Sequence, residues 1–150
     1  MGPMSPPAAG MVQIEGNAFG NSSIDPSSIE GGFLAVKDTT TTITRNDFRD
    51  SRGTSAIFID SDGPEVTLTN NIISWSGNNA VKLEGESTLP HQIINNTIVS
   101  SGANGIVGYA GTKLNIINNI ITHAATDSII DGAGSATGSN NLFYSNGRDL

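Results

Sequence analysis

Residues 114–123 read LNIINNIITH and place two asparagines inside a run of isoleucines. Burying an amide group costs free energy unless the group finds a hydrogen-bond partner. Asn118 and Asn119 therefore need a structural explanation. Similar arrangements recur along the rest of the chain as IEGNAF, ITRNDF, LTNNII, INNTI and GSNNLF.

The recurring asparagine defines a repeat. It occupies positions spaced 29, 25, 25, 23 and 22 residues apart, namely Asn17, Asn46, Asn71, Asn96, Asn119 and Asn141. A large apolar residue follows each asparagine two positions later, and an isoleucine or leucine precedes five of the six by three positions. Periods of about 20 to 50 residues are typical of solenoids, in which each repeat forms one coil.

A second apolar segment follows four of these asparagines about ten residues later, as SAIFID, NAVKLE, NGIVGY and DSIIDG. In IFID and VKLE the aliphatic residues occupy alternate positions, which is the period of a strand with one buried face. Each repeat then holds about three short strands. The sequence therefore predicts an all-β fold, a parallel β-helix of about six coils stacked ~4.8 Å apart.

In such a solenoid equivalent side chains lie above one another, so the repeated asparagine is predicted to form an internal ladder of amide hydrogen bonds. We place each ladder asparagine at a bend between two strands, because asparagine tolerates the left-handed backbone conformation better than most residues. Asn118 then precedes the bend and faces outward, while Asn119 joins the ladder. Replacing Asn96 by alanine is expected to cost ~1–3 kcal/mol.

The composition fits a β-rich domain and limits its partners. Charged residues make up 14% of the 150 residues, below the ~25% typical of soluble domains. The net charge of −7 argues against nucleic acid and anionic membranes as partners. An acidic polysaccharide would also be repelled unless calcium or a local basic patch intervened. No apolar run approaches the ~20 residues of a membrane span, so membrane insertion is not expected. The absence of cysteine excludes disulfides and thiolate metal sites.

The chain is expected to form one domain. We assign residues 1–11, which are rich in proline and small residues, to a linker or an expression remnant, and residues 12–150 to a single β-helix. This β-helix could be part of a longer solenoid. The longest insertion, residues 20–31, is expected to fold over one end or to project as a loop. Neither end reads as a capping helix, so end-to-end association into a homo-oligomer is a further expectation.

The repeat resembles the NN-x-I coils of the right-handed parallel β-helix superfamily, which includes pectate-lyase-like enzymes. The resemblance covers residues 12–145. Polysaccharide lyases, glycoside hydrolases, epimerases, phage tailspikes and adhesins share this fold, so the resemblance indicates a fold more firmly than a reaction. It implies a secreted or cell-surface protein whose partner is a polysaccharide, bound in a groove on the strand that contains IFID.

On this strand the alternation predicts two outward columns. The first contains Ala35, Phe58, Lys82, Val107 and Ile130, and the second contains Lys37, Asp60, Glu84, Tyr109 and Gly132. A further register, in the turn after each asparagine bend, contains Asp50, Trp75, Ser100 and His123. The candidates for binding sugar rings are Phe58, Trp75, Tyr109 and His123. The alternative is that these are isolated surface side chains without a ligand.

Cleavage by a lyase that acts on uronic acids would need a base at the sugar C5 proton and positive charge beside the sugar carboxylate. Lys82 with Tyr109 is the candidate base, and Arg49 or Arg52 could bind the carboxylate bidentately. The alternative is a lone lysine that keeps a strand soluble. The NTD, DD and GHG signatures of polygalacturonase-like hydrolases are absent. The sequence leaves cleavage undecided.

Calcium is the one cofactor that the sequence predicts. Its candidate ligands are four carboxylates in adjacent coils, Asp60, Asp62, Glu84 and Glu86. Stacking would gather their oxygens, which suit a hard cation. The alternative is a solvated acidic edge. His91 and His123 lack the spacing of metal ligands, and each is expected in a turn.

Two other functions remain as hypotheses. The first is a non-catalytic structural or adhesive stalk, in which the surface residues named above are merely solvated. The second is ice binding, because TIT and TLT place Thr42 and Thr44 beside Thr67 and Thr69, an arrangement similar to the threonine arrays of ice-binding solenoids. The array stops after two coils, and a threonine-rich β-surface is the simpler interpretation.

Overall fold

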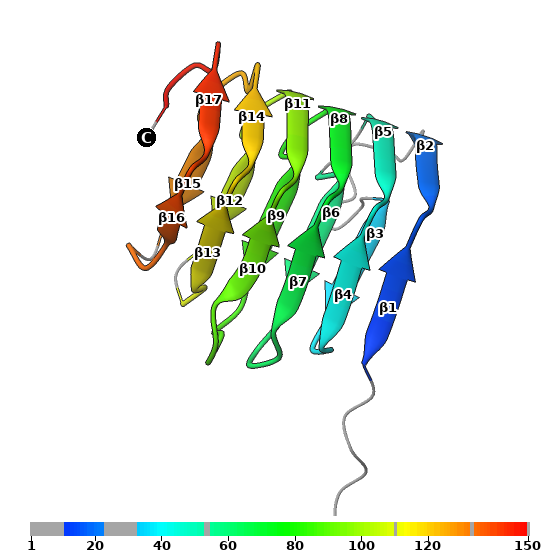
Figure 1. Cartoon of the computed structure of the whole chain (residues 1–150), viewed down its shortest axis with the longest axis vertical. Coiled ribbons are helices and arrows are strands. Elements are labelled where there is room, and N and C mark those ends of the chain that lie inside the picture. The colour runs from blue at the N-terminus through cyan, green and yellow to red at the C-terminus, as the bar shows by residue number, and fades with distance from the viewer. Residues whose placement is uncertain (1–10, 23–32, 53–54, 110, 133, 150) are drawn as a thin grey trace, which may run out of the picture.

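The described chain consists of three parallel β-sheets that wind into a solenoid. The structure, a computed structural model, describes residues 11–22, 33–52, 55–109, 111–132 and 134–149. Figure 1 shows the coils side by side, from β1 and β2 at one end to β16 and β17 at the other. Most of the predicted linker (1–11) and of the predicted insertion (20–31) lies outside the described residues.

Each complete coil contributes one strand to each sheet. Sheet A contains β1 (Val12–Glu15), β4 (Thr41–Thr44), β7 (Val66–Thr69), β10 (His91–Ile94), β13 (Leu114–Ile117) and β16 (Thr137–Ser139). Sheet B contains β2 (Ala18–Ser22), β5 (Asp47–Ser51), β8 (Ile72–Ser76), β11 (Thr97–Ser101), β14 (Ile120–Thr122) and β17 (Leu142–Tyr144). Sheet C contains β3 (Leu34–Lys37), β6 (Ile57–Asp60), β9 (Val81–Glu84), β12 (Ile106–Gly108) and β15 (Ile129–Asp131).

The predicted all-β parallel β-helix is confirmed, with a slightly smaller coil count. The described residues form five complete coils and a sixth with two strands, because sheets A and B have six strands each and sheet C has five. No helix long and apolar enough to cross a membrane occurs among them. The registers follow the sequence repeat: Leu68 pairs with Ile43 on one side and with Ile93 on the other.

The core is a stack of apolar side chains from all three sheets. Alternate residues point inward, as in β7, where Val66 and Leu68 are buried and Thr67 and Thr69 are partly exposed. The largest fully buried side chains are Ile43, Phe48, Ile57, Ile59, Leu68, Ile73, Leu83, Ile93, Ile98, Ile106, Leu114 and Ile116. Burying a side chain of this size stabilises the fold by ~1.5–3 kcal/mol.

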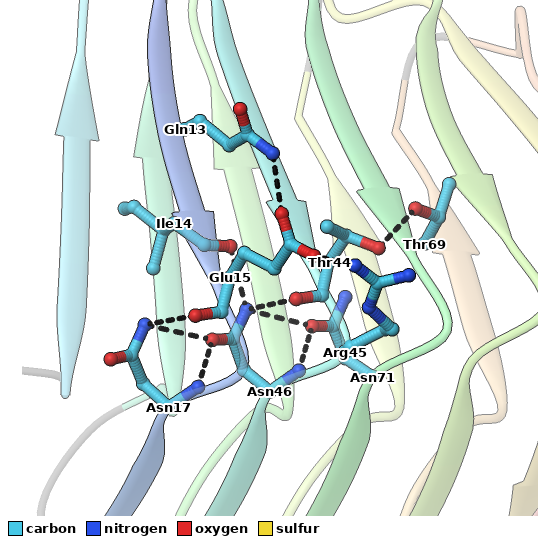
Figure 2. A network of polar contacts seen from close by, with 9 residues as sticks. All are labelled: Gln13, Ile14, Glu15, Asn17, Thr44, Arg45, Asn46, Thr69 and Asn71. Atoms are coloured by element: carbon cyan, nitrogen blue, oxygen red, sulfur yellow. Dashed lines mark hydrogen bonds and ion pairs between the residues drawn. The ribbon is translucent and has the colours of Figure 1, made fainter.

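The predicted asparagine ladder is confirmed. The middle members Asn46, Asn71, Asn96 and Asn119 are 1–2% exposed. The Oδ1 atom of Asn71, Asn96 and Asn119 accepts hydrogen bonds from the backbone N–H and the Nδ2 of the asparagine one coil earlier, at 2.9–3.1 Å. Figure 2 shows the first three members, Asn17, Asn46 and Asn71, at the bend between sheets A and B.

The left-handed backbone conformation belongs to the residue before each ladder asparagine, so that part of the prediction was wrong. The φ angle is 57° at Asn70, 58° at Asn95 and 55° at Asn118. The chain turns at these residues, and the asparagine that follows can then direct its amide into the core. Asn118 is exposed and forms the bend itself, whereas Asn119 is buried and forms the ladder.

A shorter polar stack supports the turn from sheet B to sheet C. The Nδ2 of Asn104 donates to Asn79 Oδ1 at 2.8 Å, and the Nδ2 of Asn79 donates to Ser55 Oγ at 3.5 Å. The backbone N–H of Asp127 extends the stack by donating to Asn104 Oδ1 at 3.2 Å. Sequence reasoning missed this stack, because its members are different residue types.

His91 is a buried strand residue, so its assignment to a turn was wrong. It begins β10, is 0% exposed, and its Nδ1 accepts a hydrogen bond from the backbone N–H of Val66 at 3.0 Å. Its partner in the next coil is the buried Leu114, so the position is an apolar one. Burial lowers the pKa of His91 below its ordinary value of 6.5.

The free energy of unfolding is expected to fall as the pH is lowered below about 6.5. The unfolded chain takes up a proton near the ordinary pKa, ~6.5, and the folded chain does so only at lower pH. The stability contributed by neutral His91 is thus complete above ~6.5 and is lost as the pH falls toward the folded pKa. Urea denaturation of the wild type and His91→Leu at several pH values measures this. Identical pH dependence of the two proteins would contradict it.

Candidate functional site

The outer face of sheet C displays the two columns that the sequence predicts. Phe58 pairs with Lys82, and Lys82 pairs with Val107 in the next coil. Asp60 pairs with Glu84 in the same way. Val107 is an exception to the outward pattern, since it is 3% exposed. Aromatic and charged side chains are concentrated in the middle of this face, at Phe58, Asp60, Lys82, Glu84 and Tyr109.

Lys82 lies at the centre of this face and is in contact with three predicted site residues. Its Nζ lies 5.0 Å from the centroid of the Phe58 ring and 5.3 Å from that of the Tyr109 ring. The same Nζ forms an ion pair with Glu84 Oε1 at 2.7 Å. The lysine side chain is only 18% exposed. The structure therefore brings Phe58, Lys82, Glu84 and Tyr109 into one cluster, which we name the Lys82 cluster.

A small hollow lies beside the Lys82 cluster, toward the N-terminal end of sheet C. Its volume is about 130 Å³, and it is lined by Ala35, Val36, Lys37, Phe58 and Asp60. Lys37 Nζ and Asp60 Oδ2 form an ion pair at 2.9 Å. Phe58 belongs both to the hollow and to the Lys82 cluster. The hollow and the cluster therefore form one continuous surface with both signs of charge and two aromatic rings.

Three of the four predicted calcium ligands use a carboxylate oxygen in another contact. Asp60 pairs with Lys37 and Glu84 pairs with Lys82. Asp62 Oδ1 accepts a hydrogen bond from the backbone N–H of Glu86 at 2.9 Å. No three histidine, aspartate or glutamate side chains within the described ranges are grouped as metal ligands. Calcium binding stays a prediction.

The two candidate arginines lie away from the Lys82 cluster, on sheet B and in the turn that follows it. Arg49 contacts Asp47 through two hydrogen-bonded nitrogens, and Arg52 contacts Asp50 in the same way. These hydrogen bonds raise the pKa of both arginines and lower the pKa of the Asp50 carboxyl. The structure does not bring Arg49 or Arg52 together with Lys82.

Trp75 lies in β8 of sheet B, and His123 directly follows β14 of the same sheet, so neither belongs to the strands of sheet C. They share the predicted register with Asp50 and Ser100, and each residue of this column has a left-handed backbone, with φ between 53° and 61°. Sequence reasoning missed this conformation, because Asp, Trp, Ser and His give no common signal for it. The four predicted sugar-binding residues are thus divided between two faces.

The ends of the described solenoid show core residues. A hollow of about 340 Å³ at the C-terminal end is lined by Ile116, Ile129, Ala136, Phe143 and five further residues of the last coil. A hollow of about 150 Å³ at the other end includes Val12, Ile14, Leu34 and Val36.

The predicted threonine array is present on sheet A, where the hydroxyl oxygens of Thr44 and Thr69 are 3.1 Å apart.

One comparison with known proteins gives a match. A family described as right handed beta helix region matches residues 55–150, almost two thirds of the chain. The comparisons with curated proteins and with solved structures give no match.

Proposed function

The chain belongs to the right-handed β-helix family, and from this premise we propose that it binds a polysaccharide along the outer face of sheet C, centred on Lys82. The protein would act in a secreted or surface-bound form. The observation that supports this proposal most is the Lys82 cluster, in which one ammonium group lies against two aromatic rings. Binding alone, without cleavage, would require no residues beyond those of the Lys82 cluster.

The chemistry of the cluster suits a sugar that contains a carboxylate. Aromatic rings such as Tyr109, which is 47% exposed, pack against the C–H faces of sugar rings. The ammonium groups of Lys37 and Lys82 can donate charge-assisted hydrogen bonds to a uronate carboxylate. Asp60 and Glu84 can accept hydrogen bonds from sugar hydroxyls. A polyuronate is accordingly the ligand class that we propose for this face.

Cleavage of the bound polysaccharide is a more specific proposal than binding alone. A lyase base at Lys82 or Tyr109 would accept the C5 proton, a double bond would form between C4 and C5, and the C4–O bond would break with the leaving oxygen taking a proton. Charge beside the sugar carboxylate would come from Lys37 or from calcium held by Asp60 and Glu84, since Arg49 and Arg52 project elsewhere. Lys82 is therefore proposed as a binding residue first and as a base second.

Replacing Lys82 by alanine is expected to weaken binding of acidic polysaccharide about tenfold or more, because the charge-assisted contact to the sugar carboxylate is lost. The two cation–π contacts that hold the Phe58 and Tyr109 rings in place are lost as well. Retardation of the protein in native gels that contain polygalacturonate or alginate measures this, with calcium and with chelator. Arg49→Ala is the matched control, because it removes a cation from sheet B. Equal retardation of wild type and Lys82→Ala would contradict the proposed site.

The same polysaccharides test cleavage through the ultraviolet absorbance of new unsaturated sugar ends. A signal that is lost in Lys82→Ala, while Lys82→Arg retains binding, would assign the base. Binding without a signal would make the protein a non-catalytic binding module. Absence of both binding and signal for every polysaccharide would contradict the proposed function.

The second candidate function is a structural or adhesive stalk. The C-terminal hollow, which is lined by core residues such as Ile116 and Phe143, favours it. Asn141 is the last described member of the asparagine ladder, and its Oδ1 accepts hydrogen bonds from Asn119. A coil of a second molecule that stacked on this end would continue the ladder. Light scattering over a range of concentrations tests this alternative, since a stable monomer at all concentrations would contradict end-to-end association.

A further inference from the structure

The outer face of sheet B from β8 to β17 is an exposed apolar surface. Five of the nine exposed large hydrophobic residues in the described part of the chain lie on it: Ile72, Trp75, Ile120, Leu142 and Tyr144. Two rows cross the strands of this face. One row contains Ile72, Thr97, Ile120 and Leu142, and the other contains Ser74, Val99, Thr122 and Tyr144. We name this surface the sheet B face.

Trp75 is the bulkiest residue of the left-handed column that borders this face. Its backbone is left-handed, with φ at 53°, a conformation that is costly for a bulky side chain. Its side chain is 64% exposed, so burial does not offset that cost. Glycine would fit the backbone better and asparagine nearly as well. An exposed tryptophan at a strained position indicates a ligand-binding role.

The charge of the sheet B face limits its ligand. Strands β8, β11, β14 and β17 contain no charged residue, although the whole chain has a net charge of −7. The paired charges of β5 and its following turn, such as Asp47 with Arg49, lie at one border of the face. Between the apolar side chains lie the hydroxyl groups of Thr97, Thr122 and Ser74. A ligand for this face is therefore uncharged, with apolar patches and hydrogen-bonding groups.

The spacing of the rings fits an extended ligand that crosses the strands. Trp75 and His123 share one register and are two coils apart, which corresponds to roughly 10 Å at ~4.8 Å per coil. Tyr144 lies against His123, with ring centroids 5.9 Å apart and edge to face. The rings thus form a row along the solenoid axis. Successive pyranose rings of a straight, β-linked glycan would present their C–H faces to this row.

We propose that the sheet B face binds a neutral, extended polysaccharide by stacking its sugar rings on Trp75 and Tyr144. The inference rests on the carbohydrate association proposed above, but it uses a different face and a different ligand class. The Lys82 cluster on sheet C has an ion pair and suits a polyuronate, whereas strands β8, β11, β14 and β17 of the sheet B face contain no charged residue. One module would then contact two polysaccharides at once.

Cellulose and chitin particles, mixed with the intact protein and then sedimented, test this inference. We expect the wild type to be removed from solution and Trp75→Gly and Tyr144→Ala each to bind about tenfold more weakly. Leu89→Ala is the matched control, because Leu89 is 57% exposed but lies in a turn outside both faces. Trp75→Gly is also expected to raise the melting temperature by a few degrees, which separates lost binding from unfolding.

Three results would overturn the inference. The first is a wild type that binds neither kind of particle. The second is particle binding that does not depend on Trp75, so that Trp75→Gly binds as well as the wild type. Loss of particle binding in Lys82→Ala would likewise contradict the inference, because it would assign the binding to sheet C. The third is a concentration-dependent dimer that Trp75→Gly converts to a monomer, which would make the face an interface between two copies. Retardation by acidic polysaccharide is measured separately, so failure here does not imply failure of the sheet C proposal.

Discussion

Replacing Asn96 by alanine is expected to lower the free energy of unfolding by about 3–5 kcal/mol. The Nδ2 of Asn96 contacts three acceptors, Leu68 O, Ile94 O and Asn119 Oδ1, at 3.0–3.1 Å. Its Oδ1 accepts two hydrogen bonds from Asn71. The substitution leaves several of these buried groups without partners, so the cost exceeds the ~1–3 kcal/mol expected from the sequence.

Urea denaturation of Asn96→Ala measures this loss, and Asn95→Gly is its matched control. Asn95 is the neighbouring amide, but it is exposed and has a left-handed backbone that glycine adopts without strain. We expect Asn95→Gly to change the stability by less than about 1 kcal/mol. Equal destabilisation by the two substitutions would contradict a special role for the ladder.

Phe48→Ala is expected to cost about 3–5 kcal/mol, because it leaves a cavity in the core. Phe48 is 0% exposed, and its ring stacks on the ring of Phe19 with centroids 4.6 Å apart and planes 4° apart. Phe58→Ala is the matched control: the same change on the outer face of sheet C, where the ring is partly exposed. We expect it to cost ~1 kcal/mol or less.

The comparison of these two phenylalanine variants tests which side of each strand faces the core. Phe48 and Phe58 differ by ten positions in the sequence and lie on sheets B and C. Thermal denaturation gives both stabilities under one set of conditions. A larger loss for Phe58→Ala than for Phe48→Ala would contradict the orientation of the strands described above.

The repeat made the fold predictable from the sequence. A buried amide needs partners, and six asparagines at nearly constant spacing can supply them to one another only if the coils stack. The alternation in IFID and VKLE predicted the outward columns of sheet C, and the registers of β6 and β9 confirm them. Regular spacing thus identifies stacked residues without knowledge of the structure.

The local backbone could not be predicted in the same way. The left-handed conformation was assigned to Asn119, but it occurs at Asn118, because both residues of the pair have the same propensity. The second left-handed column, which contains Trp75 and His123, marks another bend after sheet B. Without that bend, both residues appeared to lie near the groove on sheet C.

The contacts of the site depend on side-chain directions that no sequence pattern specifies. Arg49 and Arg52 look available for a ligand in the sequence, yet each reaches back two residues to an aspartate. Lys82 looks isolated, yet it contacts side chains from the preceding and following coils. These contacts join residues 24 to 27 positions apart. The coil length places these residues in adjacent coils, and the side-chain directions then decide which of them meet.

Hydrogen exchange of the intact protein, measured with and without polygalacturonate or alginate, tests whether sheet C binds a polysaccharide. We expect slower exchange of amides in β6, β9 and β12 and in the turns that follow them, with smaller changes in Lys82→Ala. Protection confined to sheet A or sheet B, or the same protection in Lys82→Ala as in the wild type, would contradict it.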